Sequence, residues 1–91
     1  MKNAQPGQEF FFHDGFSVKN IPELLEHIKK ISPVDFAYHC NDHNNDFYNW
    51  VKNCIDPSIA EDLKCVRNQR QMVEKLTGHH WSLEHKILHK Y

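Results

Sequence analysis

The 91-residue sequence lacks the signatures of several protein classes. No apolar run approaches the roughly 20 residues that a membrane-spanning helix needs, so we expect no integral membrane segment. The sequence contains no G-x-S-x-G elbow, no phosphate-cradling glycine loop and no H-E-x-x-H motif, and it has only three glycines. We therefore expect a protein without catalytic activity.

Cysteine is scarce and has no paired spacing. Cys40, Cys54 and Cys65 are odd in number and far apart, which argues against a disulfide framework and against a C-x-x-C zinc site. Residues 1–8 are polar and lack the apolar stretch of a secretory signal. We therefore expect a cytoplasmic protein whose cysteines are reduced and mostly buried.

Charge is unevenly distributed along a chain of otherwise ordinary globular composition. Residues 1–63 contain five Lys/Arg and ten Asp/Glu, a net charge of −5, and residues 64–91 contain six and two, a net charge of +4. The chain also has eight histidines. Six cations without interleaved aromatic residues make nucleic acid a weak candidate partner.

The start of the chain predicts a short β-hairpin. Two runs of strand-forming residues flank Asp14-Gly15, which suits the positive φ angles of a two-residue turn. That turn pairs Phe11 with Val18 and puts four residues on one side of the ribbon: Phe11, His13, Phe16 and Val18. A slip of one residue would present Phe10 and Phe12 instead. One aromatic face must then pack against the helices that follow.

Capping residues and apolar spacing predict the helices. Asn20, Ser32 and Asp56 are candidate N-caps with a proline just beyond them, and Asn44-Asn45 favours a break. The segment after the break carries an apolar stripe at helical spacing: Phe47, Trp50, Val51, Cys54 and Ile55. These signals predict a mainly α fold, a single-domain bundle of about five helices with a short N-terminal β-hairpin.

The last predicted helix carries a long apolar stripe with one histidine in it. Its members recur at the spacing of a coiled-coil seam: Val73, Leu76, His80, Leu83 and Ile87. A stripe of this length extends beyond a domain this small, so a homodimer through these residues is expected. The predicted organisation is a flexible tail (1–8), a helical domain with the hairpin (9–77) and a basic, His-rich C-terminal helix extension (78–91).

A dense polar cluster lies between residues 38 and 46. On an unbroken helix His39 and His43 would share a face and could hold zinc or another divalent transition metal, with Asp46 or another nearby Asp or Cys as a further ligand. The Asn-Asn break turns Asp46 onto a different helix. The alternative is a polar hinge in which Asn45 or Asp46 caps the third helix and His39 donates a hydrogen bond across the junction.

The same region carries two motifs, F-x-x-H at 36–39 and N-D-F-x-x-W at 45–50. Together with the Phe-rich strand before them and the Asp56-Pro57 segment that runs to Ala60 after them, these motifs make the chain from about residue 10 to 76 resemble a family of small prokaryotic domains of unknown function. The resemblance implies a compact, mainly helical domain and supplies no activity, substrate or cofactor. Four candidate site residues fall on these motifs: His39, Asn45, Asp46 and Trp50.

Together these features favour a non-catalytic protein-interaction or adaptor domain with an unidentified protein partner. Its expected binding surface is either the groove around His39, Asp46 and Trp50 or the basic terminal helix. The alternative function is a small divalent-metal-binding protein that uses His39, His43 and a nearby Asp or Cys.

Overall fold

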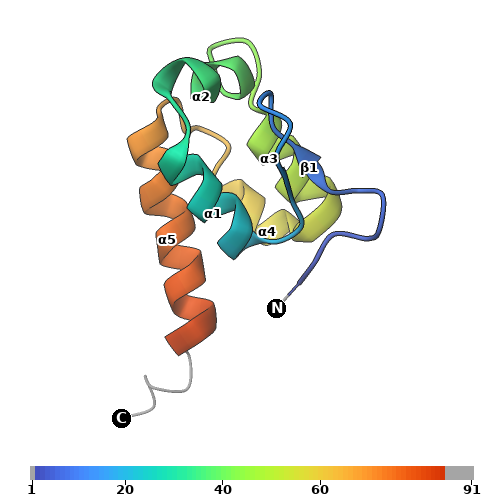
Figure 1. The fold of residues 1–91 in the computed structure, drawn as a ribbon. Helices are drawn as coiled ribbons and strands as arrows, with labels where there is room; N and C mark the ends of the chain where they lie inside the picture. The colour runs from blue at the N-terminus through green and yellow to red at the C-terminus, as the bar shows by residue number, and fades with distance from the viewer. Residues whose placement is uncertain (1, 86–91) are drawn as a thin grey trace.

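A computed structural model describes residues 2–85, with side chains as far as residue 79. Between residues 2 and 85 no helix is both long and apolar enough to cross a membrane. The elements are β1 (Phe10–Phe11), β2 (Ser17–Val18), α1 (Ile21–Lys30), α2 (Pro33–His39), α3 (Asp46–Trp50), the π-helical turn η1 (Val51–Ile55), α4 (Pro57–Glu61) and α5 (Gln69–His85). The expected mainly helical domain with an N-terminal hairpin is confirmed (Figure 1).

The first helices begin at the predicted capping residues. Asn20 accepts a hydrogen bond from the backbone N–H of Glu23 at 2.9 Å, and Ser32 accepts one from the backbone N–H of Asp35 at 3.1 Å. Asp56 caps α4 in the same manner. A proline at the first or second helical position follows each cap, where its missing N–H costs no hydrogen bond.

The third helical segment departs from one continuous α-helix. After Trp50 the chain widens into η1, and the backbone N–H of Asp56 donates to the carbonyl of Val51 at 2.8 Å, a bond over five residues instead of four. Both Val51 and Ile55 remain buried. The wider turn therefore keeps the predicted apolar stripe in the core while ending at the residue that caps α4.

The hairpin pairs in the other register, so the predicted pairing of Phe11 with Val18 is wrong. Phe10 lies opposite Val18 because the loop has three residues and ends in Gly15 at φ +92°. The backbone N–H of Gly15 donates to the carbonyl of Phe12 at 2.9 Å. Such a loop shifts the pairing by one residue relative to a two-residue turn. Phe10 and Phe12 are thereby buried, and Phe11 is 64% exposed.

The residues before the hairpin, expected as a flexible tail over 1–8, contact the domain from residue 2 onward, where the Lys2 amine lies 3.8 Å from the carboxylate of Asp56. The backbone N–H of Ala4 donates to the carbonyl of Lys19 at 2.7 Å, and the side chain of Ala4 is buried. The indole N–H of Trp50 donates to the carbonyl of Gln8 at 2.7 Å. These bonds link the start of the chain to β2 and α3.

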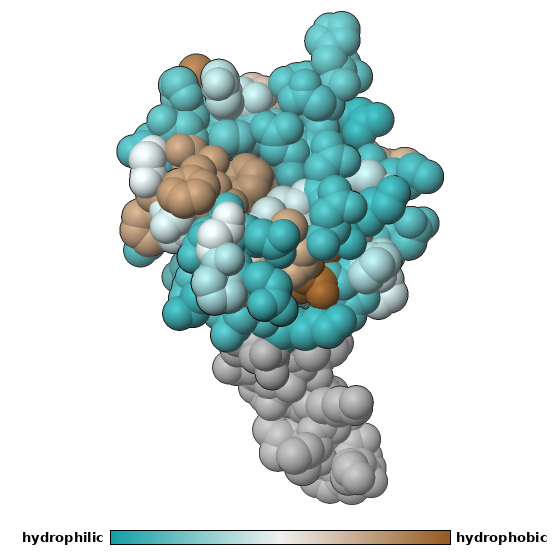
Figure 2. Space-filling view, turned by 90° about the vertical axis from the view of Figure 1, so that its right-hand side faces the viewer, coloured by the Kyte–Doolittle hydropathy of each residue, from teal (hydrophilic) through white to brown (hydrophobic). Residues whose placement is uncertain are grey.

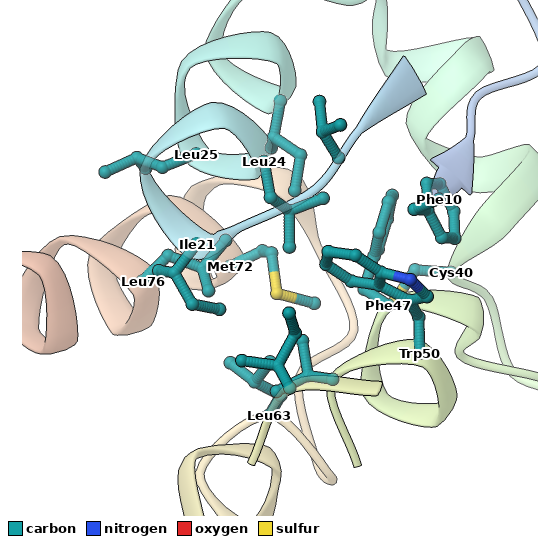
Figure 3. Packing of buried hydrophobic residues seen from close by; sticks show 14 of the residues in the cluster. Phe10, Ile21, Leu24, Leu25, Cys40, Phe47, Trp50, Leu63, Met72 and Leu76 are labelled. Atoms are coloured by element: carbon teal, nitrogen blue, oxygen red, sulfur yellow. The ribbon is translucent and has the colours of Figure 1, made fainter. Parts of the chain in front are cut away.

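The aliphatic part of the core lies between α1 and α5, which run alongside each other (Figure 1). Met72 from α5 reaches into the middle of the cluster, close to residues of α1 (Figure 3). The side-chain amide of Gln69 donates to the carbonyls of Ile28 and Ile31 at 2.8 and 2.9 Å. α5 therefore both covers α1 and closes its C-terminal end.

The stripe expected to support a homodimer is used in part by the domain itself. Leu76 is fully buried in the core and Val73 is packed against it. The side chains of the remaining members lie outside the described residues: His80, Leu83 and Ile87. Leu76 is therefore not available to a second copy of the chain.

Candidate functional site

His39 is the most enclosed histidine among residues 2–79, with 4% of its surface exposed. It is the last residue of α2, and its ring lies among aromatic rings of the hairpin and α3. Its centroid is 5.2 Å from that of Phe10, 5.7 Å from that of Phe12 and 5.5 Å from that of Phe47. A polar ring in such a setting must satisfy both of its nitrogens with hydrogen bonds.

Both ring nitrogens of His39 have a partner. Nε2 accepts a hydrogen bond from the backbone N–H of His13 at 2.9 Å, so that nitrogen carries no proton. Nδ1 lies 3.1 Å from a carboxylate oxygen of Asp46 and donates to it. The contacts fix the neutral Nδ1–H tautomer. His39 thus joins the hairpin loop, α2 and α3 through one imidazole ring.

Asn45 and Trp50 also point inward. The side-chain oxygen of Asn45 accepts from the backbone N–H of Tyr48 at 3.0 Å and caps α3, while its amide donates to the carbonyl of Leu63 at 2.9 Å. Trp50 is 8% exposed and bonded to the chain before the hairpin. The structure brings the motif residues together as a bridge between elements, and only the side chain of Asp46 among them is substantially exposed.

The arrangement is unfavourable for the metal site considered from the sequence. α2 ends at His39, so the unbroken helix that would align His39 with His43 is absent. Both nitrogens of His39 are engaged, and a metal ion would have to displace one of these hydrogen bonds. Within residues 2–79, whose side chains the structure describes, no group of three or more His, Cys, Asp or Glu could hold an ion.

The three cysteines are free but differ in exposure. Cys40 is buried, Cys54 is half-buried and Cys65 is exposed, so the expectation that most are buried is only partly correct. The thiol of Cys40 donates to the carbonyl of Val66 at 3.4 Å. Burial raises the pKa of the Cys40 thiol. A thiol that stays protonated in the core is a poor nucleophile.

A second histidine bridge was not found from the sequence. His27 on α1 lies 2.8 Å from the carboxylate of Asp14 in the hairpin loop, and its ring stacks on Phe16 with centroids 4.1 Å apart. The hydrogen bond from the Phe16 backbone N–H and then the His27 side chain hold the pKa of Asp14 below its usual value. The sequence signal for the Asp14 contact in the loop was the Asp14-Gly15 dipeptide, because the carboxylate of an Asp in a turn commonly accepts a hydrogen bond from a nearby backbone N–H.

We call His39 with its two hydrogen-bond partners, His13 and Asp46, the His39 bridge. An exposed apolar ridge lies outside it. Phe11 faces away from the core on the hairpin, and His13, two residues on, stacks on Tyr38 of α2 with centroids 4.2 Å apart. Val34 precedes Tyr38 by one helical turn and shares its face of α2. We call these four residues the aromatic ridge: Phe11, His13, Val34 and Tyr38. The hairpin side of the molecule is mostly hydrophilic, with several separate hydrophobic areas (Figure 2).

The aromatic ridge belongs to an acidic part of the chain. Residues 9–18 and 31–51, which form the hairpin, α2 and α3, contain five carboxylates and no Lys or Arg: Glu9, Asp14, Asp35, Asp42 and Asp46. Exposed rings among carboxylates offer both apolar area and a negative potential.

Comparisons with protein-family models, curated proteins and solved structures find no match for this chain.

Proposed function

We propose that this domain is a non-catalytic protein-interaction or adaptor module that binds a protein partner through the aromatic ridge. The observation that carries the proposal is the exposure of three large apolar side chains on the hairpin and α2. Val34 is 78%, Phe11 64% and Tyr38 58% exposed. Aromatic residues of this kind are enriched where proteins bind each other.

The His39 bridge supports the same proposal because it gives the aromatic ridge a fixed shape. The bond from His13 to His39 holds the hairpin loop against α2, and the stack of His13 on Tyr38 lies directly beside it. A preorganised surface loses less conformational entropy when a partner binds. The motif residues therefore contribute by positioning the surface and not by contacting the partner.

The chemistry of the buried groups supports a non-catalytic role. The lone pair and the proton of the His39 ring are both committed to protein atoms, so neither is available to a substrate. Cys40 next to it is buried, and its thiol pKa is raised. The proposal includes a cytoplasmic location, which the free cysteines, one of them exposed, support.

Affinity capture with matched surface variants tests the proposal. A Phe11→Ser, Tyr38→Ser bait removes two exposed rings, and Lys52→Ser with Lys64→Ser changes two exposed residues elsewhere. Circular dichroism first establishes that both variants melt like the parent. A partner retained by the parent and the lysine variant but lost from the ring variant supports the proposal, and equal capture by all three contradicts it.

Metal binding by His39 and His43 remains the alternative function to be tested separately. It requires the His39 ring to leave Asp46 or the His13 N–H. Elemental analysis of protein purified without a tag or chelator decides it. Stoichiometric zinc, nickel, copper or iron that is lost in His43→Ala would favour this alternative over the interaction module.

A further inference from the structure

The charge of the aromatic ridge's surroundings indicates what kind of partner it fits. The two stretches that build this end of the molecule carry five carboxylates and no Lys or Arg, and a cation beside them, Lys52, follows α3 and lies 5.7 Å from the ring centroid of Tyr48. Asp42 is exposed, Asp35 is partly exposed, and the side chain of Asp46 is 42% exposed. This end therefore attracts cations and repels anions such as nucleic acid.

We propose that the aromatic ridge binds a basic segment of another protein, whose Arg or Lys side chains lie over the exposed rings and pair with the surrounding carboxylates. This inference rests on the proposed function and adds the chemistry of the partner. The exposed faces of Tyr38 and Phe11 attract a cation through the ring quadrupole. Asp35 lies three residues before Tyr38 on α2, and Asp42 follows the end of that helix, so both carboxylates belong to the same part of the chain as the Tyr38 ring.

A second copy of this chain is the less favoured occupant, although residues 64–91 are basic. Two of the cations there already have intramolecular partners. Arg67 donates to the carbonyls of Lys64 and Val66 at 3.4 and 3.1 Å, and Arg70 lies 3.6 Å from the carboxylate of Glu74. Arg67 and Arg70 could pair with carboxylates of another copy only by giving up those contacts.

Synthetic peptides test the partner chemistry directly. The probes are a 12-residue peptide of alternating Arg and Leu, the same peptide with Gln for every Arg, and the same with Glu for every Arg. Each is titrated into isotopically labelled protein by NMR at low and at physiological salt. The basic peptide should shift the amides of Phe11, His13 and Tyr38, and its affinity should fall about fivefold or more with added salt, because surface ion pairs are screened. The other two peptides should bind at least tenfold more weakly.

Charge-reversal variants provide the matched control. Asp35→Lys with Asp42→Lys should weaken the basic peptide about tenfold, whereas Glu61→Lys with Glu74→Lys, on α4 and α5, changes the net charge equally and should have much less effect. Equal weakening by both pairs, or equal binding of the three peptides, overturns the inference.

The remaining outcomes separate this inference from the proposed function. If the ring variant loses a captured partner but the basic peptide does not bind at the aromatic ridge, the partner chemistry is wrong and the interaction function stands. If the ring variant loses nothing, the proposed function fails whatever the peptides do. If the same amides shift with protein concentration alone, a second copy is the occupant and the inference is overturned.

Discussion

The two sides of this domain are held together by different means. Between α1 and α5 the contacts are aliphatic, with Leu24, Ile28, Met72 and Leu76 fully buried. Around the hairpin, α2 and α3 the core is made of aromatic rings with hydrogen-bonded polar side chains among them, of which His39 is the most buried. Apolar burial stabilises without regard to direction, whereas hydrogen bonds between buried groups fix orientation. Both sides gain stability from apolar burial, and the comparison indicates that the hydrogen bonds of the second side also fix the shape of the exposed surface.

The largest expected change in the free energy of unfolding comes from removing a buried side chain between α1 and α5. Leu76→Ala should lower the free energy of unfolding by about 3 kcal/mol, because it removes a fully buried side chain and leaves a cavity between α1 and α5. Urea denaturation followed by circular dichroism measures the change. Val73→Ala, at a half-buried position on the same helix, is the control and should cost clearly less. Equal costs would mean that Leu76 is not central to this core.

Breaking the His39 bridge should cost less and act locally. Its two bonds can be separated, because Asn places a donor where Nδ1 lies and Gln places an acceptor where Nε2 lies. His39→Asn keeps the bond to Asp46 and leaves the His13 N–H without an acceptor, and His39→Gln does the reverse. Each should cost about 1–3 kcal/mol, the usual loss when one partner of a buried hydrogen bond is removed.

Hydrogen exchange distinguishes these two variants. The amide of His13 should exchange faster in His39→Asn than in His39→Gln, since only the latter still offers it an acceptor. Amides of α5 should behave alike in both, because α5 belongs to the aliphatic side. Identical exchange of His13 in the two variants would show that His39 does not hold the hairpin loop.

The helical part of this fold was predictable because its signals are local. A capping side chain bonds a backbone N–H two or three residues away, so Asn20, Ser32 and Asp56 marked their helices correctly. The seam assigned to the last helix was less informative. It included Leu76 but omitted Met72, which is buried at the centre of the core, since the spacing alone did not show which face of α5 would meet α1.

The site was less predictable because it depends on register and on distant contacts. Asp14-Gly15 suggested a two-residue turn, yet Gly15 closes a three-residue loop, and that single residue exchanges the buried and exposed sides of the strand. Phe11 is exposed for this reason. The bond from His13 to His39 spans 26 residues, and no spacing rule specifies such a contact.

The free energy of unfolding at alkaline pH tests how completely the thiol of Cys40 is buried. Its folded pKa is raised, so its contribution to stability is complete below the ordinary thiol pKa of about 8.5 and is lost as the pH rises through the raised value. The free energy of unfolding should therefore fall more steeply above pH 9 in the parent than in Cys40→Ala, which has no thiol there. Cys65→Ala, at an exposed position, is the control and should follow the parent.

The smallest effect is expected at the exposed bridge between the hairpin loop and α1. The pKa of Asp14 is lowered by the Phe16 N–H and His27, so its contribution is present above the ordinary Asp pKa and is lost as the pH falls through the lowered value. Asp14→Asn keeps an acceptor for Phe16 and removes the charge beside His27. The difference in unfolding free energy between parent and variant should be small at pH 5 and vanish towards pH 2.5. If Asp14→Asn lowered the free energy of unfolding at pH 5 as much as His39→Asn does, the exposed contact between Asp14 and His27 would hold the loop as strongly as the buried His39 bridge. That result would contradict our inference that the His39 bridge fixes the position of the hairpin.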